Sequence, residues 1–196
     1  MPSKRSMESL STQRLILRRW QPSDIEEFAL ICADPVVMEF HPKTLTLEQS
    51  KSMVERIEAG FDRERFGLWA LELQNSHKFI GYTGLCRPSF QAHFTPCVEI
   101  GWKIAREYWG NGFATEAARK AVEDGFERIQ LNEIVSMTAA INKRSIRVME
   151  KLKMVRNEKD DFLHPSIENG HPLKPHVLFR LSKAQWDTQL KSPTER

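Results

Sequence analysis

The chain has 196 residues and a formal net charge of +3, and 40% of its residues are hydrophobic while 28% are charged. This balance is typical of a soluble globular protein and excludes a disordered chain. The length fits one domain of ordinary size. Lys and Arg form no run interleaved with aromatic residues, so the mild positive charge does not indicate a nucleic-acid partner.

The sequence predicts neither a membrane-spanning segment nor a signal peptide. No apolar run approaches the roughly 20 residues needed to cross a bilayer, and the N-terminus lacks the apolar core of an export signal. The cysteines are odd in number and form no CxxC pair: Cys32, Cys86 and Cys97. Reduced thiols in a cytoplasmic protein are the simplest interpretation. We expect no metal site, because the C-terminal histidines lack ligand spacing: His164, His171 and His176.

The first third of the chain predicts one strand and two helices. Apolar residues alternate at the start of 14–20, which indicates an opening strand. A helix is expected over about 23–33, before an Asp-Pro pair ends it. A second helix is expected over 47–65, where Thr46 and Gln49 have the spacing of a capping box.

Three strands are predicted next, over 68–73, 79–85 and 98–104, and the first two are joined as a hairpin by residues 74–77. In the third strand apolar and polar residues alternate cleanly, so one set of side chains shares a face. That set is Cys97, Glu99, Gly101 and Lys103.

The second half of the chain carries the strongest helix signal, over 112–129, where apolar residues keep a spacing of three and four. Small residues near its start imply that this end packs closely against a sheet. A strand is expected over 133–139 and a helix over 143–153. The last strands are expected at Val155 and over 176–181.

Residues 1–196 are expected to form a single domain, with a flexible segment over 1–11 and a C-terminal tail over 183–196. The segment 158–175 is rich in Asp, His, Pro and Gly. It is long for a loop, so we interpret it as a candidate lid or substrate loop.

A glycine-rich turn from Tyr108 to Ala114 leads into the strongest helix. Such a turn leaves backbone N–H groups unpaired where the helix dipole adds about half a positive charge, which suits a diphosphate. Gly110 and Gly112 alone fit a tight structural turn equally well. No Lys-Ser or Lys-Thr pair follows them as in a Walker loop, and Thr115 stands where a dinucleotide fingerprint has Gly or Ala.

This turn and three other stretches resemble the GNAT acetyltransferases, and within them the branch that acetylates ribosomal-protein N-termini. The matching stretches are Thr12–Arg18, Glu99–Trp102, Tyr108–Ala117, and Asn142–Ser145 together with Val148–Leu152. The sequence departs from the family twice. Trp109 stands where the phosphate motif usually has Gln or Arg, and Lys153 stands where a glycine should end the last helix.

The resemblance implies an α/β fold with a mixed, largely antiparallel sheet that is splayed in its middle and has helices on both faces. Acetyl-CoA would lie in the splay as co-substrate, without a metal. The cofactor-binding residues that it implies are Lys103, Ile104, Trp109, Gly110, Asn111, Gly112, Phe113, Ala114, Thr115, Asn142 and Ser145.

Acetyl transfer to an amine requires a neutral nucleophile, and amines are largely protonated at neutral pH, so a base is useful. Glu99 is the candidate base, because several members of the family carry a glutamate on this strand that deprotonates the amine through water. The alternative is a structural glutamate that faces an edge or forms an ion pair, for which Lys103 is a candidate partner. Asp160, Asp161 and His164 are reserve candidates that fit turn positions as well.

Asn142 and Ser145 also have two interpretations. Asn142 is a good N-cap for the helix that follows it, with Ser145 at the third position. The resemblance adds that the Asn holds the pantetheine arm and that the Ser points at the cofactor sulfur. Serine does not ionise near neutrality, so Ser145 is expected to stabilise the thiolate by a hydrogen bond.

The predicted function is acetyl transfer from acetyl-CoA to a primary amine by direct attack in a ternary complex. The amine belongs to a protein N-terminus, a lysine or a small molecule. The alternative is a non-catalytic acyl-CoA-binding or regulatory module on the same fold. Acetyl-CoA and an amine acceptor are the expected partners, in a monomer or homodimer that binds neither nucleic acid nor membrane.

Overall fold

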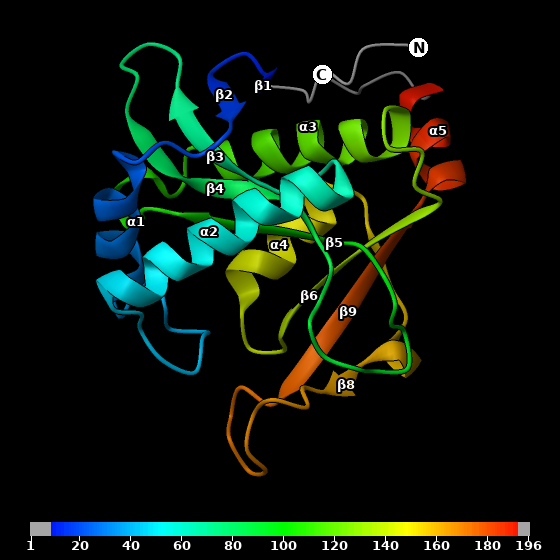
Figure 1. The fold of residues 1–196 in the computed structure, drawn as a ribbon. Coiled ribbons are helices and arrows are strands. Elements are labelled where there is room, and N and C mark those ends of the chain that lie inside the picture. Colours follow the sequence, from blue (N-terminus) through cyan, green and yellow to red (C-terminus); the bar gives the residue numbers. More distant parts are fainter. Residues whose placement is uncertain (1–8, 192–196) are drawn as a thin grey trace.

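The computed structural model describes residues 9–191, in which the strands form one large sheet and helices pack against it. Residues 1–8, within the expected flexible segment, and residues 192–196, within the expected C-terminal tail, lie outside the described residues. Over the described range the strands follow the order β1-β2-β3-β4-β5-β6-β9-β7, and β8 pairs with β9 (Figure 1). Their bounds are β1 Ser9–Ser11, β2 Leu15–Arg18, β3 Leu68–Leu73, β4 Phe79–Cys86, β5 Glu99–Ile104, β6 Glu133–Ala139, β7 Val155–Arg156, β8 Phe162–Leu163 and β9 Pro175–Ser182.

Helices cover both faces of this sheet. Their bounds are α1 Asp24–Ala33, α2 Leu47–Glu64, α3 Phe113–Glu127, α4 Lys143–Lys151 and α5 Lys183–Lys191, with short 3-10 turns η1 Arg106–Tyr108 and η2 Glu158–Asp160. Side chains of β4 alternate between the two helical layers. The Tyr82 ring lies edge-on to Phe28 of α1, whereas Leu85 reaches α3 at Gly125. The pair α1 and α2 therefore covers one face, and α3 with α4 covers the other (Figure 1).

The sheet splits between β5 and β6. These two strands form its only parallel pair among the described strands, and their ladder has a single register pair, Glu99 with Val135. The Ser136 hydroxyl donates to the Ile100 carbonyl at 3.0 Å, and beyond this point the strands separate. The predicted mixed, largely antiparallel and splayed sheet is thus confirmed.

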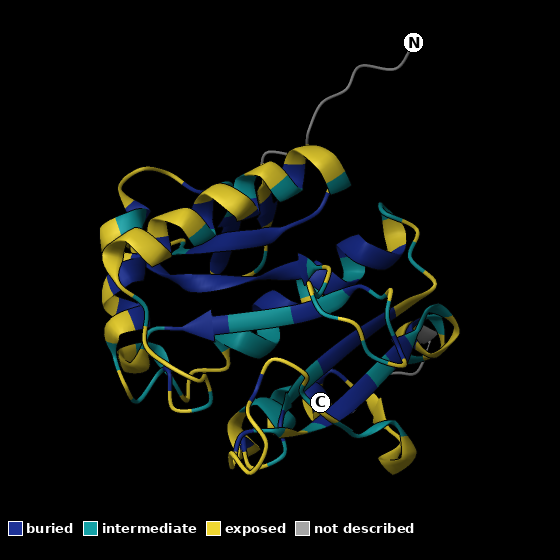
Figure 2. Ribbon diagram, turned by 60° about the horizontal axis from the view of Figure 1, so that its bottom comes forward, coloured by how far each residue is buried: buried dark blue, intermediate teal, exposed yellow. Residues whose placement is uncertain are grey.

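The core follows from the periodicity of the elements. Figure 2 shows buried strands beneath helices whose outer turns are exposed. Helix α3 buries Ala117, Ala118 and Ala121 against β4 and β5, and such small residues let the helix backbone approach the sheet closely. Helix α2 begins with the expected capping box, in which Thr46 and Gln49 each accept a backbone N–H of the other.

The described parts of both chain ends form regular elements. Residues 9–11 form β1, which pairs with β2, so the expectation of a flexible segment was wrong there. Residues 183–191, within the expected C-terminal tail, form the helix α5. Its Trp186 is 2% exposed and packs against Phe126, and this burial of a large aromatic residue stabilises the helix.

The segment 158–175 is more ordered than its composition indicates. It contains η2 and β8, and β8 pairs with β9. Ile167 and Leu173 are buried in a small apolar cluster with Ala139. These contacts hold the segment against the sheet half that lies beyond the splay.

Candidate active site

The predicted phosphate turn connects β5 through η1 to helix α3. Gly110 and Gly112 both have a φ of 81°, in the left-handed region that glycine adopts most readily. A Cβ at Gly110 would have no neighbour within 4 Å, and one at Gly112 would meet only the Arg14 guanidinium at 3.6 Å. The turn therefore requires glycine for its backbone conformation, and the space in front of it is open.

Helix α3 begins at this turn without a side-chain cap. Gly112 is the N-cap residue, and the first-turn amides of Phe113, Ala114 and Thr115 find no acceptor among residues 9–191. Unpaired amides and the positive end of the helix dipole together make a site for an anion.

Side chains within the turn fix its shape. The Trp109 indole N–H donates to the Ile104 carbonyl at 2.7 Å, which ties the turn to the end of β5. The Asn111 amide donates to the Tyr108 and Trp109 carbonyls at 3.1 and 3.2 Å. Asn111 was predicted to bind the cofactor, but its side chain folds back onto the turn and does not line the cavity described next.

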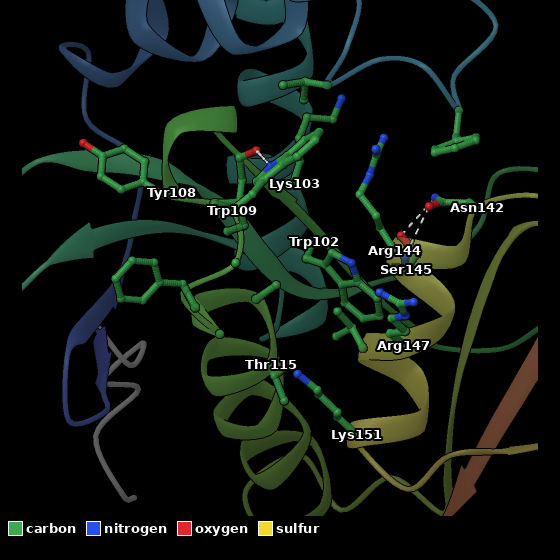
Figure 3. A pocket seen from close by; sticks show the side chains of 18 of the residues that line it. Trp102, Lys103, Tyr108, Trp109, Thr115, Asn142, Arg144, Ser145, Arg147 and Lys151 are labelled. Carbon is green, nitrogen blue, oxygen red and sulfur yellow. Dashed lines mark hydrogen bonds between the residues drawn. The ribbon is translucent and has the colours of Figure 1, made fainter.

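A cavity of about 300 Å³ opens in front of the turn, between β5, α3 and α4 (Figure 3). It is lined by Val37, Phe40, His41, Trp102, Lys103, Ile104, Tyr108, Trp109, Gly110, Gly112, Phe113, Ala114, Thr115, Asn142, Arg144, Ser145, Arg147, Val148 and Lys151. Four of these residues are Lys or Arg, and none of the described Asp or Glu residues is among them. The lining therefore suits an anionic ligand.

The opposite wall is the first turn of α4. The Asn142 Oδ1 accepts the Ser145 backbone N–H at 3.2 Å, as expected for an N-cap. Its Nδ2 donates to Ser145 Oγ at 3.0 Å and to Thr138 Oγ1 at 2.9 Å. Because Ser145 Oγ already accepts a hydrogen bond from Asn142, its own proton is free to point elsewhere. A hydroxyl donor is thus positioned at the cavity wall.

One face of α4 carries cations along the cavity. Arg144 pairs with Glu39 at 2.6 Å, and its guanidinium lies 4.5 Å from the centre of the Trp109 ring. Arg147 and Lys151 are exposed and form no ion pair with any described residue. In the view of Figure 3, Lys151 points from α4 toward the start of α3.

Glu99 lies outside this cavity lining, where β5 and β6 begin to separate. It is on the α1/α2 face, because it pairs with Cys86 of β4 in register with Tyr82 and Lys103. Desolvation raises the pKa of its carboxyl to about 7, while the backbone of Met137 lowers it in part. Its only described side-chain donor is the Cys86 thiol, at 4.0 Å, and it forms no ion pair within residues 9–191. Glu99 and Lys103 therefore form no ion pair with each other, and the alternative of an edge-facing structural glutamate stays open.

The reserve bases are occupied elsewhere. Asp160 pairs with Arg180 at 2.7 Å, and Asp161 pairs with Arg156. The His164 ring packs at a tilt against the rings of Phe90 and His176, at 4.6 and 4.9 Å between ring centres. Glu99 is the carboxyl among these candidates that has no cationic partner in the described part of the chain.

The structure brings most of the predicted residues together. Of the predicted catalytic and cofactor-binding residues, all except Glu99 and Asn111 line this cavity, and the three reserve bases do not. Sequence reasoning missed Val37, Phe40, His41, Trp102, Tyr108, Arg144, Arg147, Val148 and Lys151. The spacing of Arg144, Arg147 and Lys151 along one helix face was a signal that could have found three of them.

Residues 9–191 offer neither a membrane-spanning helix nor a cluster of metal ligands. The described helices include none with the length and apolar character needed to cross a membrane. Nor do His, Cys, Asp and Glu side chains gather anywhere in that range as a metal site would require.

Comparison with known proteins identifies the family. The acetyltransferase (GNAT) domain family matches residues 14–155. The chain is 33% identical to the uncharacterized protein YkkB of Bacillus subtilis over 149 residues, which cover 74% of this chain and 84% of that protein. It is 31% identical to the uncharacterized N-acetyltransferase YoaA of the same organism, over 86% of this chain and 93% of that protein.

Solved structures share the fold at low sequence identity. Ribosomal-protein-S5-alanine acetyltransferase from Vibrio fischeri has a TM-score of 0.72 at 18% identity, with 91% of this chain and 98% of that chain covered. Spermidine N-acetyltransferase from Vibrio cholerae, solved with CoA and spermine, has a TM-score of 0.69 at 16% identity, with 89% and 99% covered. Likeness at this level shows the fold alone.

Proposed function

The chain belongs to the GNAT acetyltransferase family, and we propose that it transfers an acetyl group from acetyl-CoA to a primary amine. The observation that carries this proposal is the uncapped start of α3 at the edge of a cation-lined cavity. The diphosphate of acetyl-CoA would accept hydrogen bonds from the amides of Phe113, Ala114 and Thr115.

Other residues of the cavity are placed to contact the remaining parts of acetyl-CoA. The exposed charges of Arg147 and Lys151 would lie beside its phosphate groups. The gap between β5 and β6 leaves backbone groups of 101–104 without a ladder partner on that side, and the pantetheine arm carries amides that such groups bind. The thioester would then lie near Ser145, where Asn142 holds the hydroxyl in place.

The chemistry follows from two residues on different faces. Glu99, with its pKa raised to about 7, would take a proton from the amine, which then attacks the thioester carbonyl. The C–S bond breaks as the C–N bond forms, and the thiolate leaves with its charge stabilised by the Ser145 hydroxyl. The amide nitrogen gives up its second proton, and the thiolate takes up a proton to leave as the CoA thiol. A Cβ at Gly101 would have no neighbour within 4 Å, so β5 is open on the side where Glu99 lies.

A non-catalytic acyl-CoA-binding module on the same fold is the second candidate. The uncapped helix fits both functions, because it concerns binding alone. The elevated pKa of Glu99 favours the enzyme. Burying a carboxyl group without a cationic partner does not stabilise the fold, whereas a raised pKa is common among catalytic bases.

The experiment that tests the proposal uses acetyl-CoA with a labelled acetyl group and a panel of primary amines. We expect at least one amine to yield equal amounts of acetylated product and free CoA thiol, in proportion to enzyme. Tight binding of acetyl-CoA without amine-dependent thiol release across the panel would support the binding module instead.

A further inference from the structure

Lys103 of β5 is a buried cation without an anionic partner. The residue is 6% exposed. Its Nζ lies 3.0 Å from Met38 Sδ and 3.8 Å from Cys32 Sγ, and 6.0 Å from the centre of the Tyr82 ring. No Asp or Glu among residues 9–191 forms an ion pair with it.

These neighbours satisfy an ammonium poorly. Lysine has three N–H donors, and sulfur is a weak acceptor. A buried charge without a counter-ion is costly, and proteins normally provide a carboxylate or a bound ligand to offset that cost. The buried ammonium group of Lys103 is therefore poorly satisfied by its described neighbours.

The position of Lys103 indicates where an anionic partner would come from. Lys103 lines the same cavity as the phosphate turn, and its side chain is drawn there in Figure 3. It also shares the α1/α2 face of β5 with Glu99, four residues earlier, which places the two Cα atoms about 13 Å apart along an extended strand. Between them Gly101 leaves the strand surface open.

The other cations of the cavity lie on α4. Arg144 is paired with Glu39, while Arg147 and Lys151 are exposed on the α4 side. Lys103 is thus the buried cation on the side of the sheet where Glu99 lies, and that side would receive the acceptor.

We propose that the acceptor is a primary amine that also carries a carboxylate, and that the ammonium group of Lys103 binds this carboxylate. The inference rests on the proposed function and narrows its substrate class. An amino acid and the acidic N-terminal region of a peptide both offer this chemistry. A polyamine does not, because its second ammonium group would meet the charge of Lys103.

The electrostatics of the site agree with this assignment. Desolvation lowers the pKa of Lys103, because burial disfavours its ammonium form. An incoming carboxylate would raise the pKa of Lys103 again and offset the cost of burying its charge. The charge of Lys103 also lowers the pKa of His41 at the cavity mouth, after desolvation as the larger cause.

The test compares binding of three matched probe series to the full chain loaded with CoA. The series are ω-amino carboxylates of increasing length, n-alkylamines of the same lengths and the corresponding diamines. A tetrapeptide with an acidic second residue and its neutral analogue form a further arm, which distinguishes a peptide source from a small amino acid. Calorimetry gives the affinities, and labelled acetyl-CoA reports transfer in parallel.

The variant is Lys103→Met, which keeps an unbranched side chain among Met38 and Cys32 and removes the charge. Lys103→Arg keeps the charge. The matched control is Lys43→Met, which removes one charge from an exposed position on the same segment as His41. Thermal unfolding checks the fold, and we expect Lys103→Met to be at least as stable as the natural chain, because a buried unpaired charge is lost.

We expect one ω-amino carboxylate or the acidic peptide to bind about tenfold or more tightly than its neutral counterpart. Lys103→Met should abolish that preference, and Lys103→Arg and Lys43→Met should retain it. Equal affinities for the two series, tighter binding of diamines, or a preference that survives in a folded Lys103→Met would overturn the inference. Acetylation of diamines alone would overturn it while supporting the proposed function. Selective carboxylate binding without any acetyl transfer would support the inference and contradict the proposed function.

Discussion

At the scale of single residues, the raised pKa of Glu99 predicts how turnover should depend on pH if Glu99 is the proposed base. Its carboxyl has a pKa raised to about 7 by desolvation, so the basic form appears as the pH rises through that value. We expect kcat/KM to rise through an inflection near pH 7, and Glu99→Gln to lack that inflection. The variant should lose turnover by about a hundredfold or more near pH 7 to 8.

Ser145→Ala is the matched comparison for this profile. It removes a single hydrogen bond to a developing charge, and serine does not titrate near neutrality, so its loss should be nearly constant with pH. An unchanged inflection in Glu99→Gln would place the base elsewhere. Acetyl-CoA affinity, measured by calorimetry, should stay the same in Glu99→Gln, because Glu99 does not line the cavity.

The same shift makes stability depend on pH. The folded chain binds a proton at Glu99 between the ordinary pKa of a glutamate and about 7, whereas the unfolded chain has already released it. Stability from this group is therefore present at low pH and lost as the pH rises through 7. Thermal unfolding of Glu99→Gln relative to the natural chain should show an advantage for the variant that grows over this range.

Residue roles could be predicted only where they follow local pattern. The N-cap role of Asn142 and the face of Glu99 follow from spacing, and both are confirmed. The surroundings of the Lys103 side chain could not be predicted, because Cys32 and Met38 lie 71 and 65 positions away in the sequence. Long-range packing of this kind leaves no periodic trace.

At the scale of elements, the start of α3 is the feature most open to a test. Gly112→Asp would place a carboxylate and a Cβ at the uncapped helix end, where the diphosphate is proposed to bind. We expect acetyl-CoA affinity to fall at least about tenfold, and calorimetry measures it. Gly170→Asp is the control, because Gly170 has a similar φ of 82° and lies outside the cavity lining. Equal acetyl-CoA affinity in both variants would remove the turn from the site.

The basic face of α4 gives a second test at this scale. Arg147→Gln with Lys151→Gln should weaken CoA binding, at about 0.2–1 kcal/mol for each exposed charge. Dephospho-CoA carries fewer phosphate charges, so the double variant should weaken its binding less than that of CoA. Lys143→Gln, on the same helix but outside the cavity lining, should change neither affinity. A larger loss for dephospho-CoA would show that these residues act on another part of the molecule.

Elements with strong periodicity could be predicted, and elements that depend on their neighbours could not. Helices α2 and α3 have apolar stripes, and both appear within two residues of their expected bounds. Strand β1 has three residues and exists through pairing with β2. Lys153 adopts a φ of 58° after α4, the left-handed conformation that the missing glycine would take most readily.

At the scale of the whole molecule, the sheet consists of two halves with a short connection between β5 and β6. A single ladder pair, the Ser136 hydrogen bond and the hydrogen bond of the Met137 backbone to Glu99 link the two strands, and the cavity is lined by residues of β5 and none of β6. The splay was expected from the family resemblance and not from residue patterning, because local sequence does not specify where two parallel strands separate. The segment 158–175 likewise shows its order only through β8 and the buried Ile167 and Leu173.

A crystal structure of the chain with CoA tests the central claim most directly. We expect diphosphate oxygens within about 2.7–3.2 Å of the amides of Phe113, Ala114 and Thr115. The pantetheine arm should lie in the gap between β5 and β6, with its sulfur beside Ser145 Oγ. CoA bound elsewhere, or bound with these three amides still unpaired, would contradict the account.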